Sequence, residues 1–120
     1  MKQILIIDDE PEVGNLLKDF LEQSGYKAFV ATTGAAGLEI VKKNSPDVVL
    51  LDIVMPRMDG IECLKRIKET KPETIVIMMS GLQDESLARR AIEAGAYDYV
   101  RKPLNLSYLE ENLLERIFPG

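Results

Sequence analysis

The sequence predicts an α/β protein, built as a doubly wound sheet of five parallel strands with helices on both faces. Three observations support this class. Short apolar segments alternate five times with segments whose apolar residues recur at helical spacing. The short segments are apolar almost throughout, which is typical of parallel strands that are covered on both faces. The chain has 120 residues, 46% of them hydrophobic, so we expect residues 1–120 to form a single domain with a sizeable core.

Five segments have the length and composition of buried strands. They comprise residues 3–8, 27–31, 47–52, 74–80 and 97–100. Most are rich in β-branched, aromatic or other large apolar residues, and all are too short to form an independent helix.

A helical pattern follows each predicted strand, with apolar side chains three or four positions apart. These apolar residues run from Val13 to Leu21, from Leu38 to Val41 within residues 34–44, from Ile61 to Ile67, from Leu87 to Ile92, and from Leu113 to Ile117. The predicted order is therefore a strand followed by a helix, five times over.

The ends of these helices carry ordinary sequence signals. Pro11 suits the first turn of the first helix, and Gly25 stands just past its end. Asp84 is placed to cap the fourth helix. Ser107 and Glu110 have the spacing of a capping box, which predicts that the last helix opens at Ser107.

The order of the strands follows from the rules for parallel sheets. Right-handed crossovers leave few arrangements, of which we favour the flavodoxin-like order 2-1-3-4-5. In such a sheet, ligands bind beyond the carboxyl ends of the strands, where the strand order reverses. For this order, that point lies between the first and third strands.

The residues at these strand ends are polar and chemically complementary. Asp8 and Asp9 follow the first strand, Asp52 ends the third, Ser80 ends the fourth and Lys102 follows the fifth. Three carboxylates in one crevice repel each other unless they take up protons or share a cation. Oxygen ligands without His or Cys select Mg²⁺, Mn²⁺ or Ca²⁺. A site with only a small number of protein ligands, in which water completes the shell, favours Mg²⁺ among these. Such a pocket suits phosphoryl transfer, with Asp52 as a possible acceptor.

Composition excludes several other functions. The net charge of −5 argues against direct nucleic-acid binding, which requires a positive surface. The chain has no histidine, which removes His-dependent catalysis and imidazole metal ligands. The single cysteine, Cys63, allows no disulfide within the chain and has the apolar neighbours of a buried structural thiol. No apolar run is long enough to cross a membrane, so we expect a cytoplasmic protein.

The whole chain resembles the receiver domain of bacterial two-component response regulators. The resemblance rests on IDDEP at 7–11, LLDIVMPRMDG at 50–60, SG at 80–81 and AGAYDYVRKP at 94–103. It implies a phospho-accepting switch that takes its phosphoryl group from a histidine kinase or a phosphotransfer protein in a Mg²⁺-dependent reaction. The protein would thus catalyse its own phosphorylation and dephosphorylation, without turning over an external substrate.

The resemblance also assigns roles to the residues at the strand ends. Asp52 matches the phosphorylated aspartate, and Lys102 matches the lysine that pairs with the phosphoryl group. Asp9, Asp52 and the backbone carbonyl of Val54 match protein ligands of Mg²⁺, with Asp8 acting chiefly through a bound water. The peptide bond from Lys102 to its following proline matches one that is cis in the family.

The output of the switch is also implied by the resemblance. Ser80 matches the switch hydroxyl, and Tyr99 matches the aromatic residue that turns inward after phosphorylation. The surface of the fourth helix, fifth strand and fifth helix would then signal to an effector domain or partner, and a homodimer through this surface is possible. Val54 and Leu82 stand at positions that vary in the family, and both are apolar here. We expect them to shield the acyl phosphate and slow its hydrolysis.

Three other functions remain open from the sequence. An Asp-nucleophile phosphohydrolase commonly has an acid two residues past its nucleophile, where Val54 stands. A flavin-binding electron carrier of the same topology would not present Asp8, Asp9 and Glu10 to a phosphate. A receiver-like interaction module that is not regulated by phosphorylation is the remaining alternative, and the complete set of site residues argues against it.

Overall fold

The part of the chain that the structure describes contains one sheet of five parallel strands, which confirms the predicted class. The structure is a computed structural model that describes residues 2–55, 59–81 and 84–119. The strand order is β2-β1-β3-β4-β5, as the sequence predicts. The strands are β1 (Gln3–Ile7), β2 (Lys27–Ala31), β3 (Val48–Asp52), β4 (Ile75–Ser80) and β5 (Asp98–Arg101).

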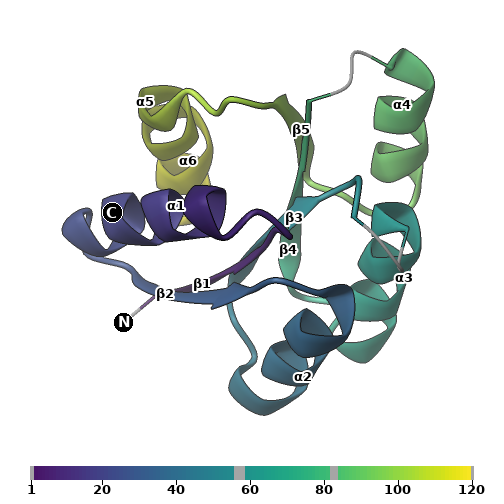
Figure 1. The fold of residues 1–120 in the computed structure, drawn as a ribbon, viewed down its shortest axis with the longest axis horizontal. Coiled ribbons are helices and arrows are strands. Elements are labelled where there is room, and N and C mark those ends of the chain that lie inside the picture. Colours follow the sequence, from purple (N-terminus) through teal and green to yellow (C-terminus); the bar gives the residue numbers. More distant parts are fainter. Residues whose placement is uncertain (1, 56–58, 82–83, 120) are drawn as a thin grey trace.

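Helices cover both faces of this sheet (Figure 1). They are α1 (Pro11–Gln23), α2 (Gly34–Asn44), α3 (Gly60–Thr70), α4 (Glu85–Glu93) and a C-terminal helical segment of α5 (Leu106–Tyr108), η1 (Leu109–Leu114) and α6 (Glu115–Ile117). The C-terminal segment and α1 lie on one face, and α2, α3 and α4 lie on the other (Figure 1). No helix in the described ranges combines the length and the apolar character needed to span a membrane.

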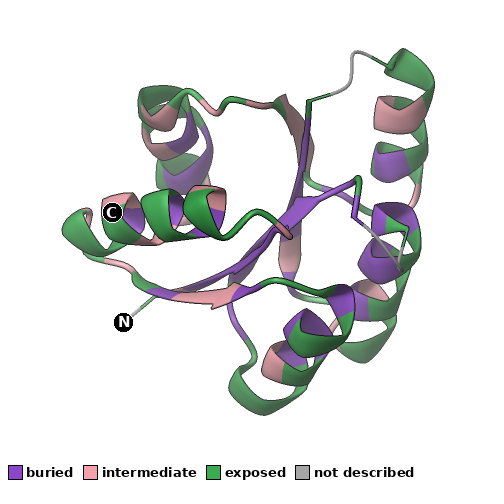
Figure 2. Ribbon diagram, viewed as in Figure 1, coloured by how far each residue is buried: buried purple, intermediate pink, exposed green. Residues whose placement is uncertain are grey.

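The sheet separates two apolar cores. Side chains alternate along β1, so that Leu5 and Ile7 pack on the α2–α4 side while Ile4 and Ile6 pack on the α1 side. All four side chains are fully buried, and the sheet is buried along most of its length (Figure 2). Cys63 lies in the first of these cores, and burial raises the pKa of its thiol to about 11. Its placement agrees with the predicted structural role.

Most helix ends follow the sequence signals. Pro11 occupies the first turn of α1, and Gly25 has a φ of 96°, a conformation that glycine adopts at little cost. The Asp84 side chain accepts hydrogen bonds from Ser86 N and Leu87 N, as a cap does. The Asp59 side chain likewise caps α3 by accepting a hydrogen bond from Ile61 N at 2.8 Å.

The predicted start of the last helix was wrong. Asn105, not Ser107, is the cap, because its side-chain oxygen accepts a hydrogen bond from Tyr108 N at 3.0 Å. The helix therefore begins at Leu106, and Ser107 lies inside its first turn. In this arrangement the partly buried Leu106 packs against the α1-side core, which favours the earlier start. The Lys102–Pro103 peptide bond that precedes this helix is cis, as the resemblance implied.

The middle of the C-terminal helix is a π-helix rather than the expected α-helix. In a π-helix, each backbone N–H bonds to the carbonyl five residues earlier, so residues five positions apart lie on one face. Leu109, Leu113 and Leu114 are accordingly all buried in the α1-side core. The apolar spacing predicted a helix here, and its π form places Leu109 and Leu114 on the same buried face.

Gly60 fixes the start of α3 beside the end of β3. Its N–H donates to Ile53 O at 3.1 Å, and a Cβ atom at Gly60 would lie 2.5 Å from both Ile53 Cα and Ile53 O. Because these are backbone atoms, they cannot move aside as a side chain can. Gly60→Ala is therefore expected to lower the free energy of unfolding by about 3 kcal/mol, as measured by urea denaturation. Gly81→Ala is the control, because no atom of the described residues beyond its chain neighbours lies within 4 Å of its added Cβ; equal losses in both variants would contradict the expectation.

Candidate functional site

The carboxyl ends of three strands bring together the acids and the lysine that the sequence singles out. Asp8 follows β1, Asp52 ends β3, and Lys102 follows β5. The strands β1 and β3 are neighbours, with Ile7 paired to Leu51, so the next residue of each chain segment enters the same crevice. Asp8 is fully buried and Asp52 is 4% exposed. Two buried carboxylates from distant parts of the chain therefore share one site.

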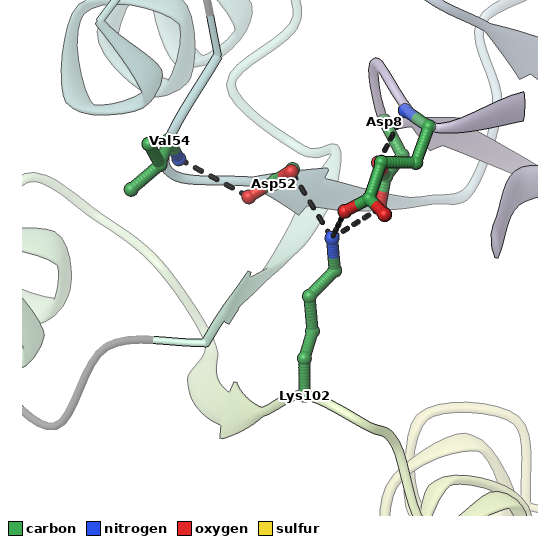
Figure 3. Close-up of polar contacts among 5 residues, drawn as sticks. Asp8, Asp52, Val54 and Lys102 are labelled. Carbon is green, nitrogen blue, oxygen red and sulfur yellow. Dashed lines mark hydrogen bonds and ion pairs between the residues drawn. The ribbon is translucent and has the colours of Figure 1, made fainter.

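Lys102 reaches into this crevice and contacts three carboxylates. Its Nζ lies 2.7 Å from Asp8 Oδ2, 3.1 Å from Asp52 Oδ2 and 3.4 Å from Glu10 Oε1. Figure 3 shows the ammonium between the Asp8 and Asp52 side chains. The lysine thus supplies a fixed positive charge at the point where the two buried acids approach each other.

In Asp8 and Asp52, a backbone N–H group binds the carboxylate oxygen that does not face Lys102. Asp8 Oδ1 accepts a hydrogen bond from Glu10 N at 2.9 Å. Asp52 Oδ1 accepts one from Val54 N at 3.1 Å (Figure 3). Each acid therefore has one oxygen bound to its own loop and one directed toward Lys102. This arrangement sets the rotamers of both carboxylates before any ligand arrives.

The electrostatics of the site follow from this packing. Burial raises the pKa of Asp52, and the nearby charge of Asp8 adds to that effect. The Val54 N–H and Lys102 act in the opposite direction without cancelling the rise. For Lys102, burial acts to lower the pKa, but the contacts with Asp8 and Asp52 outweigh it and raise the pKa above its ordinary value. The lysine therefore remains a cation at any physiological pH.

Four carboxylates at this edge have the chemistry of a divalent-cation site. We call Asp8, Asp9, Glu10 and Asp52 the acid cluster; one oxygen from each lies within 4.8 Å of the others. Together with Lys102, these side chains carry three more negative charges than positive ones. Asp8 Oδ2 is buried and accepts no well-directed hydrogen bond from the described residues, although the ammonium lies 2.7 Å away. Hard oxygen donors with surplus charge fit Mg²⁺.

The two predicted switch residues lie on the neighbouring strands β4 and β5. Ser80 is the last residue of β4 and is fully buried, and its backbone oxygen accepts a hydrogen bond from Lys102 N at 2.8 Å. Tyr99 is half-buried on β5, pairs with Met78 in the ladder and packs against the α2–α4 core. Leu82, which the sequence analysis grouped with Val54, lies outside the described residues.

Glu10 is the member of the cluster to which the sequence analysis gave no role. Its carboxylate approaches Lys102, yet 64% of its side chain is exposed. The available signal was its position, directly after Asp8 and Asp9 and directly before the first helical residue, Pro11. An acid at that point projects from the loop toward the same crevice as its two predecessors.

Comparison with known proteins identifies the family of this fold and site. The model of the response regulator receiver domain matches residues 4–114, and the chain belongs to that family. The chain is 41% identical over 102 residues to the chemotaxis protein CheY of Bacillus subtilis (strain 168), covering 84% of this chain and 85% of that protein.

Two further relatives extend the match to nearly the whole chain. The CheY protein of Thermotoga maritima is 37% identical over 113 residues, covering 93% of this chain and 94% of that protein. Among solved structures, a CheY-like receiver domain protein from Methanospirillum hungatei JF-1 has a TM-score of 0.93 and 31% identity, covering 98% of this chain and 94% of that chain. The resemblance to the receiver domain is thereby confirmed.

Proposed function

We propose that this chain is a phosphorylation-dependent signalling switch whose acceptor is Asp52. The donor would be the phosphohistidine of a histidine kinase or of a phosphotransfer protein, since this chain has no histidine of its own. The observation that supports this most strongly is the Asp52 carboxylate, buried at a strand end with Lys102 Nζ at 3.1 Å. Membership in the receiver family supports phosphorylation-based signalling in general.

The chemistry uses groups that are already in place. The Asp52 carboxylate attacks phosphorus, an O–P bond forms, the P–N bond of the donor breaks, and the imidazole leaves. The side chain changes from one negative charge to about two, and the fixed ammonium of Lys102 offsets part of the gain. Mg²⁺ held by Asp9, Asp52 and the Val54 carbonyl, with Asp8 acting through water, would supply charge neutralisation at the phosphoryl oxygens. The chain would turn over no external substrate.

The proposed output runs from Ser80 to the surface. Attraction of the Ser80 hydroxyl toward the new phosphoryl oxygens would leave space into which Tyr99 can turn, and this would change the surface of α4, β5 and α5. That surface would contact an effector domain, a partner protein or a second copy of the chain. Residues 1–120 would act as one receiver domain in the cytoplasm.

Intact mass spectrometry tests the proposed acceptor. Incubation with acetyl phosphate and Mg²⁺ is expected to add the mass of one phosphoryl group to the wild-type chain and none to Asp52→Asn, because an amide cannot act as this nucleophile. Asp19→Asn, a change of an exposed acid on α1, serves as the matched control and should be modified like the wild type. Modification of Asp52→Asn to the same extent would overturn the assignment.

Val54 provides a test of the lifetime of the acyl phosphate. Its side chain is 54% exposed and its N–H is bound to Asp52, so it stands beside the acceptor without offering a polar side-chain group. Val54→Asn is expected to shorten the lifetime about fivefold, the effect of one added hydrogen bond to an attacking water. The decay of phosphorylated protein, followed by intact mass after removal of the donor, measures this. A lifetime equal to or longer than that of wild type would contradict the shielding role.

A further inference from the structure

Glu10 occupies the solvent side of the Lys102 ammonium. The other two contacts of that ammonium, Asp8 and Asp52, have side chains that are 0% and 6% exposed, whereas the Glu10 side chain is 64% exposed. Any molecule that approaches Lys102 from solvent therefore meets the negative charge of Glu10 before it meets the buried acids.

Glu10 also stands where the acid cluster opens into an apolar groove. This groove has a volume of about 390 Å³ and runs between the start of α1 and the segment after β5. Its described lining is apolar apart from Glu10 and Lys102, and comprises Val13, Leu16, Leu17, Gly81, Pro103, Leu104 and Leu106. The charge of Glu10 is thus placed at the mouth of the site, between the Lys102 ammonium and the apolar groove.

The structure gives the Glu10 side chain an ion pair with Lys102, and the start of α1 does not depend on that contact. Glu10 precedes α1 at the capping position, but its side chain makes no capping hydrogen bond. Only its backbone takes part in the helix start, where Glu10 O accepts from Val13 N and Gly14 N. Its carboxylate can therefore be neutralised without removing a cap.

We propose that Glu10 is a specificity-determining residue that disfavours small anionic phosphodonors at this site. The inference rests on the proposed phosphorylation of Asp52. A donor such as acetyl phosphate brings its phosphoryl oxygens toward Lys102, where the Glu10 carboxylate repels them and competes for the ammonium. A protein donor that presents a cation of its own to Glu10 is spared this repulsion. Glu10 in this way favours transfer from a protein over transfer from a free acyl phosphate.

The same charge has the opposite effect on a divalent cation. Because the Glu10 carboxylate lies within 4.8 Å of the other acids of the cluster, it attracts Mg²⁺ to the site whether or not it becomes a ligand. Neutralising Glu10 should therefore weaken Mg²⁺ binding while making the site more accepting of an anion. This pair of opposite effects is specific to a charge, and loss of local structure would weaken both.

Two measurements on Glu10→Gln test the proposal, with Glu12→Gln as the matched control. Glu12 is exposed in the first turn of α1, so its substitution makes the same change in net charge away from the crevice.

In the reaction with acetyl phosphate, acetate leaves and the phosphoryl group passes to Asp52. At saturating Mg²⁺ and low ionic strength, the second-order rate constant for Glu10→Gln should exceed that of wild type roughly fivefold, from one charge a few ångströms away in an aqueous setting. The excess should shrink as salt is raised to about 0.5 M. Isothermal titration calorimetry with Mg²⁺ alone should give a weaker Kd for Glu10→Gln.

The outcomes separate this inference from the function on which it rests. A wild-type chain that is labelled at Asp52 as fast as Glu10→Gln, at every ionic strength, overturns the role of Glu10 and leaves the acceptor assignment intact. An equal acceleration in Glu12→Gln also overturns it, because the effect would then belong to the net charge of the chain. Failure of the wild type itself to take up label overturns the proposed function and this inference together.

Discussion

Lys102→Met is expected to lower the free energy of unfolding by about 3–5 kcal/mol when divalent cations are absent. Methionine keeps most of the apolar stem of lysine but removes the charge that lies 2.7 Å from Asp8 Oδ2 and 3.1 Å from Asp52 Oδ2. Asp8 is fully buried and Asp52 nearly so, and therefore water cannot replace the lost cation. Urea denaturation in the presence of a chelator measures the effect.

Two further variants show whether the loss comes from uncompensated charge. Lys43→Met removes an exposed lysine at the end of α2 and should change stability by less than about 0.5 kcal/mol. Adding Asp8→Asn to Lys102→Met should restore part of the lost stability, because it removes one of the stranded carboxylates. A loss below about 1 kcal/mol in Lys102→Met would show that the lysine does not balance the buried acids.

Asp52→Asn is expected to be more stable than wild type without metal, and to gain less stability than wild type from Mg²⁺. Burial raises the pKa of Asp52 in the folded chain above its unfolded value, so the ionised side chain costs stability once the pH exceeds that unfolded value. At neutral pH without metal, Asp52→Asn should therefore be more stable than wild type by about 1–2 kcal/mol, the scale of the desolvation cost of one buried polar group. Mg²⁺ at about one hundred times its Kd should stabilise the wild type by about 2.7 kcal/mol and the variant by less.

Chemical denaturation with chelator and then with Mg²⁺ checks both halves of this expectation. Asp52→Asn should be the more stable protein in chelator, and its lead should be reduced or lost in Mg²⁺. An equal gain from Mg²⁺ in both proteins would mean that Asp52 does not help to hold the cation. Lower stability of Asp52→Asn in chelator would mean that its contact with Lys102 outweighs the cost of burying it.

The placement of the principal site residues was predictable because strand ends are set by the hydrophobic pattern. The apolar runs that end at Asp8 and Asp52 are typical of buried parallel strands. The crossover rules for such strands bring those two ends together. Lys102 could be placed at the same edge of the sheet because it comes just after the last predicted strand. What could be predicted was therefore which residues meet at one edge of the sheet.

Finer features depended on packing that the sequence alone does not contain. Asn105 and Ser107 are both good caps, and the start at Asn105 is the one that accompanies the packing of the partly buried Leu106 against the α1-side core. The π-helix brings Leu109, Leu113 and Leu114 into the α1-side core together, which the helical spacing alone does not predict. Glu10 could be recognised as a third consecutive acid, but its approach to Lys102 depends on the path of the loop into α1.

The hydrogen bond from Lys102 N to Ser80 O joins the two ends of the site through the backbone rather than through side chains. At 2.8 Å it continues the ladder between β4 and β5 by one step, so the backbone positions of Lys102 and Ser80 are linked directly. Movement of the main chain at either residue displaces the other. An engineer who wishes to re-aim one of them must redesign both strand ends at once.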